Sequence, residues 1–165
     1  MFRDIRRSRQ ALPEAESLAI LERGSHGVLA VLGDGGYPYA VPLNYVYEGG
    51  ALYFHCARSG HKYDAVKACP RASFCVIDRS DVVPEDYSTN YRSVIAFGEV
   101  RVVTDEAAKR RAIECLAKKY SPDDSEANRA AVIDREWDTL CVLELHIEHL
   151  SGKEAMALAK ARRGE

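Results

Sequence analysis

The sequence lacks the features that mark a membrane-spanning, secreted or nucleic-acid-binding protein. No apolar run in its 165 residues approaches the ~20 residues that a membrane helix needs. The first residues are charged, with no apolar segment behind them, so they do not form a signal peptide. The net charge of −2 gives no basic excess of the kind that binds nucleic acid. We expect neither a membrane nor a nucleic-acid partner.

Cysteine pairs and the common catalytic signatures are missing as well. The five cysteines are odd in number and include no Cys-x-x-Cys pair, which favours free thiols in a reducing compartment. There is no Ser-His-Asp order and no Gly-x-Ser-x-Gly elbow, which argues against a hydrolase. His146 and His149 are three apart on an expected strand and so face opposite sides of it. We expect a cytoplasmic protein without a metal centre.

The sequence does contain many short extended segments and few helices. Its composition, 47% hydrophobic and 29% charged residues, is typical of a globular protein. The pattern predicts one domain over residues 1–165, with an arm at 1–11 and a tail at 152–165 that either forms a helix or frays. Strands are expected at 28–32, 37–47, 51–56, 71–77, 91–103 and 139–149, with an acidic loop at 79–90. Helices are expected at 12–24, between Gly60 and Pro70, at 104–119 and at 125–133.

This pattern predicts a mainly β fold, an antiparallel barrel of six strands with flanking helices, because tight turns join several of the strands. Two residues inside expected strands carry more specific information. Pro42 cannot donate a ladder hydrogen bond, so its strand is an edge, contains a bulge, or meets something other than a neighbouring strand. Gly98 indicates a bulge or bend.

The loop that follows the third expected strand has the chemistry of an anion site. Arg58, Ser59, Gly60, His61 and Lys62 occupy this loop and the first turn of the next helix. Unpaired N–H groups, the positive end of the helix dipole and nearby cationic side chains all favour an anion there. A solvated basic connection is the alternative.

Four segments together resemble the flavin-binding split barrels of the pyridoxamine 5'-phosphate oxidase-like superfamily, nearest its nitroimidazole-resistance-type branch. They are Gly35-Gly36-Tyr37-Pro38-Tyr39-Ala40-Val41-Pro42-Leu43-Asn44-Tyr45, Leu52-Tyr53-Phe54-His55-Cys56-Ala57, Gly60-His61-Lys62 and Cys69-Pro70-Arg71. The likeness runs from about residue 26 to residue 103 and returns at 137–153. It implies a split barrel with Greek-key character that forms a homodimer and holds FMN between the subunits.

The same resemblance implies which residues contact the cofactor. The backbone near Pro42 would meet the flavin ring, His55, Cys56 and Ala57 would follow the ribityl chain, and Gly60, His61 and Lys62 would hold the phosphate. The full set expected to bind the cofactor is Pro42, Leu43, Asn44, His55, Cys56, Ala57, Gly60, His61, Lys62 and Trp137. In the pyridoxamine-phosphate oxidases an Arg-Lys pair stands where this chain has His61 and Lys62. A neutral imidazole offers one donor where Arg offers a charged fork, which argues against pyridoxamine phosphate as the substrate.

The roles of Trp137 and of the histidines remain open. Trp137, the only tryptophan, is either a core anchor or a lid that the partner subunit places on the flavin, and the core is the more common role. An exposed histidine is also able to serve as an axial haem ligand.

The resemblance therefore leads to two candidate functions. The first is an FMN-dependent oxidoreductase that takes electrons from a reduced cofactor and reduces a small molecule such as a nitroaromatic or a quinone. The second is a protein that carries or senses flavin or haem without turnover. The residues alone do not separate them.

Overall fold

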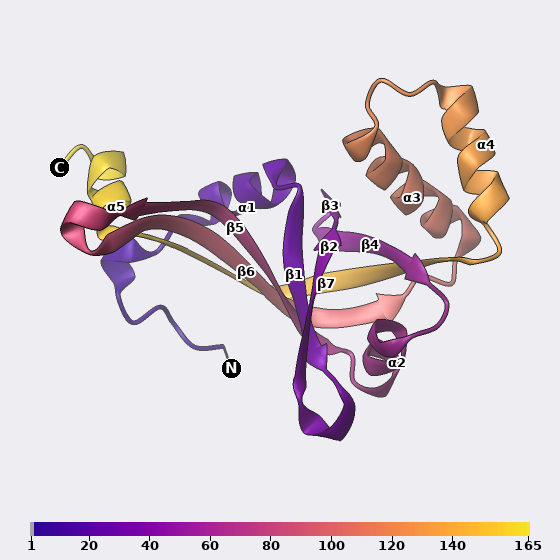
Figure 1. Cartoon of the computed structure of the whole chain (residues 1–165), viewed down its shortest axis with the longest axis horizontal. Helices are drawn as coiled ribbons and strands as arrows, with labels where there is room; N and C mark the ends of the chain where they lie inside the picture. Colours follow the sequence, from indigo (N-terminus) through magenta and orange to yellow (C-terminus); the bar gives the residue numbers. More distant parts are fainter. Residues whose placement is uncertain (1) are drawn as a thin grey trace.

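In a computed structural model that describes residues 2–165, the chain folds into one antiparallel sheet with helices around it (Figure 1). The strands are β1 (His26–Leu32), β2 (Pro38–Asn44), β3 (Val46–Glu48), β4 (Ala51–Ala57), β5 (Arg71–Val83), β6 (Ser88–Val102) and β7 (Leu140–Glu154). The helices are α1 (Glu14–Arg23), α2 (His61–Ala68), α3 (Glu106–Tyr120), α4 (Glu126–Glu136) and α5 (Met156–Arg163). Short 3₁₀ turns are η1 (Ser8–Gln10), η2 (Asp34–Gly36) and η3 (Pro84–Asp86).

The sheet has seven strands in the order β2-β1-β5-β6-β7-β4-β3, so the predicted count of six was wrong. The expected strand at 37–47 is one run that breaks at Tyr45. Its first part, β2, pairs with β1, and its second part, β3, pairs with β4. These two parts are the opposite edges of the sheet, and within residues 2–165 no ladder joins them. The sheet is therefore open and is not closed into the barrel that the sequence predicted, and a single residue connects its two edges.

Tyr45 holds this connection in place. Its side chain is 0% exposed, and its hydroxyl donates to the carbonyl oxygen of Leu21 at 2.8 Å. Its backbone N–H donates to the Tyr120 hydroxyl at 2.8 Å. That hydroxyl has one proton to share between the carbonyl oxygens of Tyr45 and Ser25. Tyr120 at the end of α3 thus satisfies the polar groups that the strand break removes from the ladders.

The acidic loop expected at 79–90 is a strand hairpin instead. β5 continues to Val83 and β6 begins at Ser88, with pairing out to the Val83–Ser88 pair. The turn between them is η3 followed by Tyr87 with φ +46°, in the left-handed region. Local acidity indicated a loop, but an exposed hairpin arm accepts charged residues on both faces. In Figure 1 this arm extends away from the centre of the sheet toward α5.

The predicted bulge at Gly98 is present. The register between β6 and β7 shifts at Phe97/Gly98, so that Gly98 lies opposite Ile147. A Cβ on Gly98 would lie 1.8 Å from the carbonyl oxygen of His146. Only glycine therefore fits at this position without moving the backbone.

The segment expected as a tail at 152–165 is ordered and packs against the N-terminal arm. β7 extends to Glu154, and α5 takes up most of the remaining residues. Glu154 is 0% exposed, and its carboxylate accepts from Arg92 at 3.0 Å and from Arg162 on α5 at 2.8 Å. Arg163 donates to the carbonyl oxygen of Arg9 at 2.8 Å. The two ends of the chain therefore stabilise each other.

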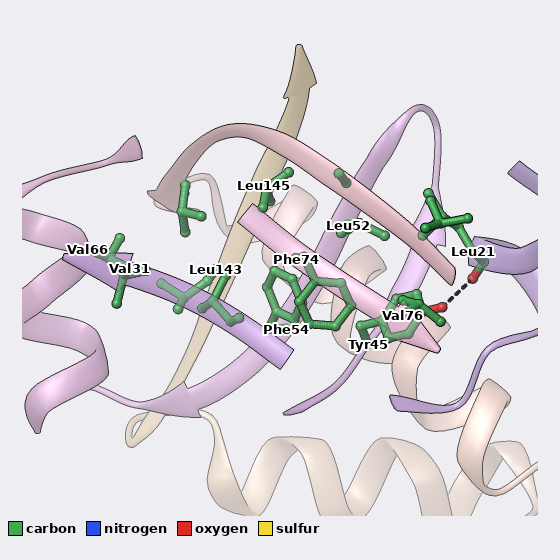
Figure 2. Packing of buried hydrophobic residues seen from close by; sticks show 14 of the residues in the cluster. Leu21, Val31, Tyr45, Leu52, Phe54, Val66, Phe74, Val76, Leu143 and Leu145 are labelled. Atoms are coloured by element: carbon green, nitrogen blue, oxygen red, sulfur yellow. Dashed lines mark hydrogen bonds between the residues drawn. The ribbon is translucent and has the colours of Figure 1, made fainter. Parts of the chain in front are cut away.

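The main core fills the inside of the curved sheet (Figure 2). The rings of Phe54 and Phe74 have centroids 4.9 Å apart, and Tyr45 meets Phe74 edge-on at the same distance. A second, smaller cluster lies under α3 and α4 and comprises Val46, Ala112, Ile113, Leu116, Ile133 and Val142.

A side chain caps the start of each of the two helices over this second cluster. The Asp105 carboxylate accepts the N–H of Ala108 at 2.8 Å and caps α3, and the Ser125 hydroxyl accepts the N–H of Asn128 at 3.1 Å and caps α4. None of the helices described over residues 2–165 has the length and apolar composition needed to cross a bilayer.

We expect Tyr120→Phe to destabilise the fold, because it leaves the polar groups of Tyr45 without a partner. The free energy of unfolding should fall by about 1–3 kcal/mol, the cost of an unsatisfied buried hydrogen-bonding group. Urea unfolding with an unchanged slope would measure this loss. Tyr87→Phe removes the same atom from a residue that is 99% exposed and should change stability by no more than about 0.5 kcal/mol. Equal effects of the two substitutions would contradict the role assigned to Tyr120.

Candidate functional site

The candidate site begins where two neighbouring strands separate. The ladder between β3 and β4 ends at the pair Val46–Tyr53. On the N-terminal side of Tyr45 the chain no longer pairs with β4 and pairs with β1 instead. If the β3–β4 ladder continued into β2 in the same register, Asn44 would lie opposite His55, and Pro42 would lie opposite Ala57. All four of these residues are exposed. We call the gap between these two strands, lined by Pro42, Asn44, His55 and Ala57, the strand opening. All four of these residues belong to the set expected to bind the cofactor.

Pro42 lies on an edge strand, one of the three alternatives that the sequence left open. Its ladder partner on β1 is Val28, and β2 has no other neighbour among the described strands. A proline is tolerated at such a position because its missing N–H takes no hydrogen bond away from an inner ladder.

An apolar cavity of about 280 Å³, partly open to solvent, lies between helices α3 and α4 beside the strand opening. Asn44 and His55 contribute to its lining, and Leu140 at the start of β7 forms part of its wall. Desolvation by the neighbouring protein groups, and to a smaller extent the charge of Lys62, lower the pKa of His55, although its side chain keeps contact with solvent. His55 is therefore a neutral imidazole at pH 7, able to donate one hydrogen bond and accept another.

A second hollow, which we call the cationic cleft, lies on the other side of Leu140. It measures about 260 Å³, and Arg58, Tyr63, Thr104 and Lys109 are among the residues that line it. Arg58 donates from Nε to the carbonyl oxygen of Leu140 at 3.4 Å. Because Leu140 lines both hollows, the apolar cavity and the cationic cleft lie next to each other.

Lys62 lies close to the inner ends of β4 and β7. Its charge acts on the pKa values of His55, Cys56 and Cys141. Arg58 and Lys109 also act on Cys141. Three cations, from α2, the loop before it and α3, therefore act electrostatically on Cys141, and the cationic cleft has Arg58 and Lys109 against one carboxylate, Glu106. This excess of positive charge is suited to an anion.

The anion site predicted from the sequence falls at the start of α2. Gly60 has a φ of +103°, a conformation that side chains other than glycine rarely adopt. In the part of the chain that the structure describes, no side chain caps this helix. The N–H groups of its first turn therefore remain available to a ligand.

The side chain of His61 is occupied elsewhere. Its ring stacks on Tyr39 with centroids 4.0 Å apart, and its Nε2 lies 3.4 Å from the backbone nitrogen of Asp34. A Cβ on Gly33 would lie 3.0 Å from the same Nε2. The side chain of His61 therefore packs α2 against the β1–β2 hairpin. At the anion site His61 can contribute only its backbone N–H.

Leu43 and Cys56 point into the core, so only their backbone atoms face the strand opening. Cys56 lies directly opposite Cys141 on β7. Burial raises the pKa of Cys56 to about 12 and also raises the pKa of Cys141. Both side chains are therefore protonated thiols at neutral pH and poor nucleophiles.

Trp137 is half-buried and packs against the smaller core cluster. Its indole N–H donates to the carboxylate of Glu106 at 2.9 Å. The ammonium of Lys109 lies 3.8 Å from its ring centroid and donates to its carbonyl oxygen at 2.9 Å. Within this chain Trp137 packs beside Lys109 and Glu106, two residues that line the cationic cleft.

Lys109 is the site residue that sequence reasoning missed. It is 2% exposed, and burial, followed by the charge of Arg58, lowers its pKa. One feature of the sequence could have identified it: Lys109 lies on the same face of the helix as the apolar residues Ile113 and Leu116. A lysine on an apolar stripe has to find a polar partner, and here that partner is Trp137.

Among residues 2–165, no three His, Cys, Asp or Glu side chains gather into a group that could hold a metal ion.

Comparison with protein families adds a match over most of the chain. The family model described as pyridoxamine 5'-phosphate oxidase matches residues 13–154. A search of curated proteins finds no significant match.

Several solved structures share the fold. A structure named for a 5-nitroimidazole antibiotic resistance protein from Bacteroides thetaiotaomicron is 21% identical, with a TM-score of 0.72, over 87% of this chain and 86% of that one. A FAD-binding protein from Mesorhizobium loti is 24% identical, with a TM-score of 0.62, over 88% of this chain and 97% of that one. A FAD- and haem-binding protein from Mycobacterium smegmatis is 22% identical, with a TM-score of 0.72, over 89% of this chain and 73% of that one.

Proposed function

The chain belongs to the pyridoxamine 5'-phosphate oxidase family, and on that premise we propose that it is a flavin-binding oxidoreductase that holds FMN at the strand opening. The observation that carries this proposal is the pair of hollows that meet at Leu140, one cationic and one apolar. FMN has the matching polarity, with a phosphate at one end and an aromatic ring system at the other.

The residues present fit this cofactor. Lys62 and the N–H groups at the start of α2 bind the phosphate, and the charges of Arg58 and Lys109 add to the attraction. The outer faces of β2 and β4 orient the ring, with Pro42 and Asn44 on one side and His55 and Ala57 on the other.

When bound, the flavin supplies the electron-transfer chemistry, and the protein binds, orients and shields it. His55 is neutral, so it is able to donate to or accept from a ring atom without adding charge. Helices α3 and α4 lie beside the strand opening and supply an apolar wall there. The electron acceptor we propose is a small molecule such as a nitroaromatic or a quinone, and the donor is a reduced nicotinamide or deazaflavin.

We also propose a homodimer, because an apolar outer face of the sheet adjoins the strand opening. Alternate residues of β1, β2 and β5 present Val28, Leu32, Pro38, Ala40, Pro42 and Ile77 on this face. Ile77 is 65% exposed, and contiguous apolar surface of this kind marks an interface. A second copy related by a two-fold axis would cover the face and complete two equal sites.

Ile77→Asp should weaken this dimer by placing a carboxylate in the apolar face. Sedimentation velocity at micromolar concentration is expected to give twice the 18.4 kDa of one chain for the wild type and a larger monomer fraction for the variant. Tyr87→Asp, a matched control at the tip of the hairpin arm, should leave the mass unchanged. A monomeric wild type that still binds flavin would exclude the shared site.

Lys62→Ala should weaken FMN binding by roughly 10- to 100-fold. Hydrogen bonds to charged groups contribute about 1.5–3 kcal/mol, and every ~1.4 kcal/mol corresponds to a tenfold change in affinity. Riboflavin lacks the phosphate, so its affinity should hardly change. Fluorescence titration of both ligands into wild type and variant measures the difference.

Lys67→Ala is the matched control, because it removes the same charge from the other end of the same helix. We expect less than a twofold effect on either ligand. An equal loss for FMN and riboflavin in Lys62→Ala, or no loss for FMN, would place the phosphate elsewhere.

FMN-loaded protein should also turn over. Under anaerobic conditions a reduced nicotinamide or deazaflavin is expected to bleach the flavin absorbance faster than it bleaches free FMN, and a quinone should restore it. If the flavin stays oxidised with every donor, the carrier or sensor function takes precedence. A Soret band in the purified protein would favour haem, which one similar structure binds by name.

A further inference from the structure

Two cysteines lie side by side at the end of the sheet next to the cationic cleft. Cys56 on β4 is directly opposite Cys141 on β7 in the ladder between these strands. Both side chains pack on the inner face of the sheet, and a hydrogen bond joins their thiols. Directly opposed residues of antiparallel strands have Cβ atoms about 4.5–5.5 Å apart, and a disulfide needs about 3.5–4.5 Å. A small approach of the two strands is therefore enough to join the sulfur atoms.

The cationic cleft gives a small molecule access to one of the two thiols. Cys141 is 3% exposed, yet it lines this cleft together with Arg58 and Lys109. A cysteine enclosed in a core acts as a small apolar residue, whereas Cys141 forms part of the wall of a hollow of about 260 Å³. A molecule as small as hydrogen peroxide is able to enter a hollow of this volume.

From these observations we propose that Cys56 and Cys141 are an oxidisable dithiol, a modification site at which hydrogen peroxide converts the two thiols into a reversible disulfide. The inference goes beyond the flavin-binding function and does not depend on it. The sequence favours a reducing compartment, in which disulfides are usually transient and serve catalysis or redox sensing. A disulfide that forms under oxidant and is reduced again belongs to this class.

The hydrogen bond between the thiols determines which of them reacts first. Burial raises the pKa of Cys141, but the hydrogen bond from Cys56 and the charges of Arg58 and Lys109 offset part of that rise. In Cys56 burial has the largest effect, and the same hydrogen bond raises the pKa further. Cys141 is therefore the first of the pair to form a thiolate, which is the reactive species. Because the thiolate fraction at neutral pH is small, the oxidation is slow.

The reaction proceeds in two steps. The Cys141 thiolate attacks one oxygen of the peroxide, the O–O bond breaks, and a hydroxide leaves and takes up a proton to become water. The resulting sulfenic acid on Cys141 is then attacked by the sulfur of Cys56, whose proton goes to the departing oxygen. The S–O bond breaks and the S–S bond forms. In total, two thiols give two electrons and two protons to one peroxide, and one disulfide and two waters result.

The test counts thiols in the full chain before and after oxidation. Folded protein is treated with hydrogen peroxide at a concentration that oxidises free glutathione completely, and the remaining thiols are alkylated in urea and counted by intact mass. Of the five cysteines, we expect two to become resistant to alkylation and dithiothreitol to restore both. Peptide mapping should identify the link as Cys56–Cys141.

Single variants test the order of the two steps. Cys56→Ala removes the second sulfur, so the sulfenic acid on Cys141 should persist and react with dimedone. Cys141→Ala should lose both the disulfide and the dimedone label. Cys75→Ala is the matched control, because it removes another half-buried strand cysteine on β5. It should form the disulfide at a rate within twofold of the wild type.

Three results would overturn the inference. The first is alkylation of all five thiols after the peroxide treatment, and the second is a disulfide that contains Cys69, Cys75 or Cys115. The third is dimedone labelling of Cys56 in Cys141→Ala without labelling of Cys141 in Cys56→Ala, which would contradict the assigned order. Circular dichroism checks that each variant is folded. If Cys141→Ala does not fold, the wild-type peptide map and the label in Cys56→Ala still decide the outcome.

Discussion

The burial of Tyr45 is the constraint on which the rest of this structure depends. A strand run of eleven residues, 38–48, is shared between two edges of one sheet, and the residue at the change of partner belongs to neither ladder. Its backbone would be unsatisfied without the Tyr120 hydroxyl, and its side chain anchors the turn to Leu21. Because buried polar groups are costly when unpaired, these hydrogen bonds determine where the sheet opens.

The strand opening is a direct consequence of that break. Had the run continued beside β4, Asn44 and His55 would form a cross-strand pair on the outer surface. Their separation instead leaves two exposed strand faces with α3 and α4 beside them. The helix that supplies the Tyr120 hydroxyl also forms one wall of the apolar cavity. Fold stability and site shape therefore depend on the same contacts, so substitutions at the end of α3 should affect both.

The sequence predicted the local features of this fold better than its long-range ones. Periodicity identified most strands and helices. Backbone chemistry narrowed Pro42 to three alternatives, one of them the edge strand, and Gly98 to a bulge or a bend. The break at Tyr45 was missed because only a residue 75 positions away satisfies it. The hairpin arm was missed because its acidic residues are compatible with both loops and exposed strands. The site residues were named by resemblance, and Lys109 required knowledge of what packs around Trp137.

The position of His61 changes how the phosphate would be recognised. An arginine at this position would present a charged fork to the ligand, whereas His61 stacks on Tyr39 and lies against Gly33. Its side chain thus stabilises the placement of α2, and recognition is left to backbone N–H groups and Lys62. A site built in this way depends on the position of the helix more than on any one side chain. The absence of the arginine is therefore compatible with phosphate binding, because the N–H groups of α2 would bind the phosphate and the histidine stabilises the position of that helix.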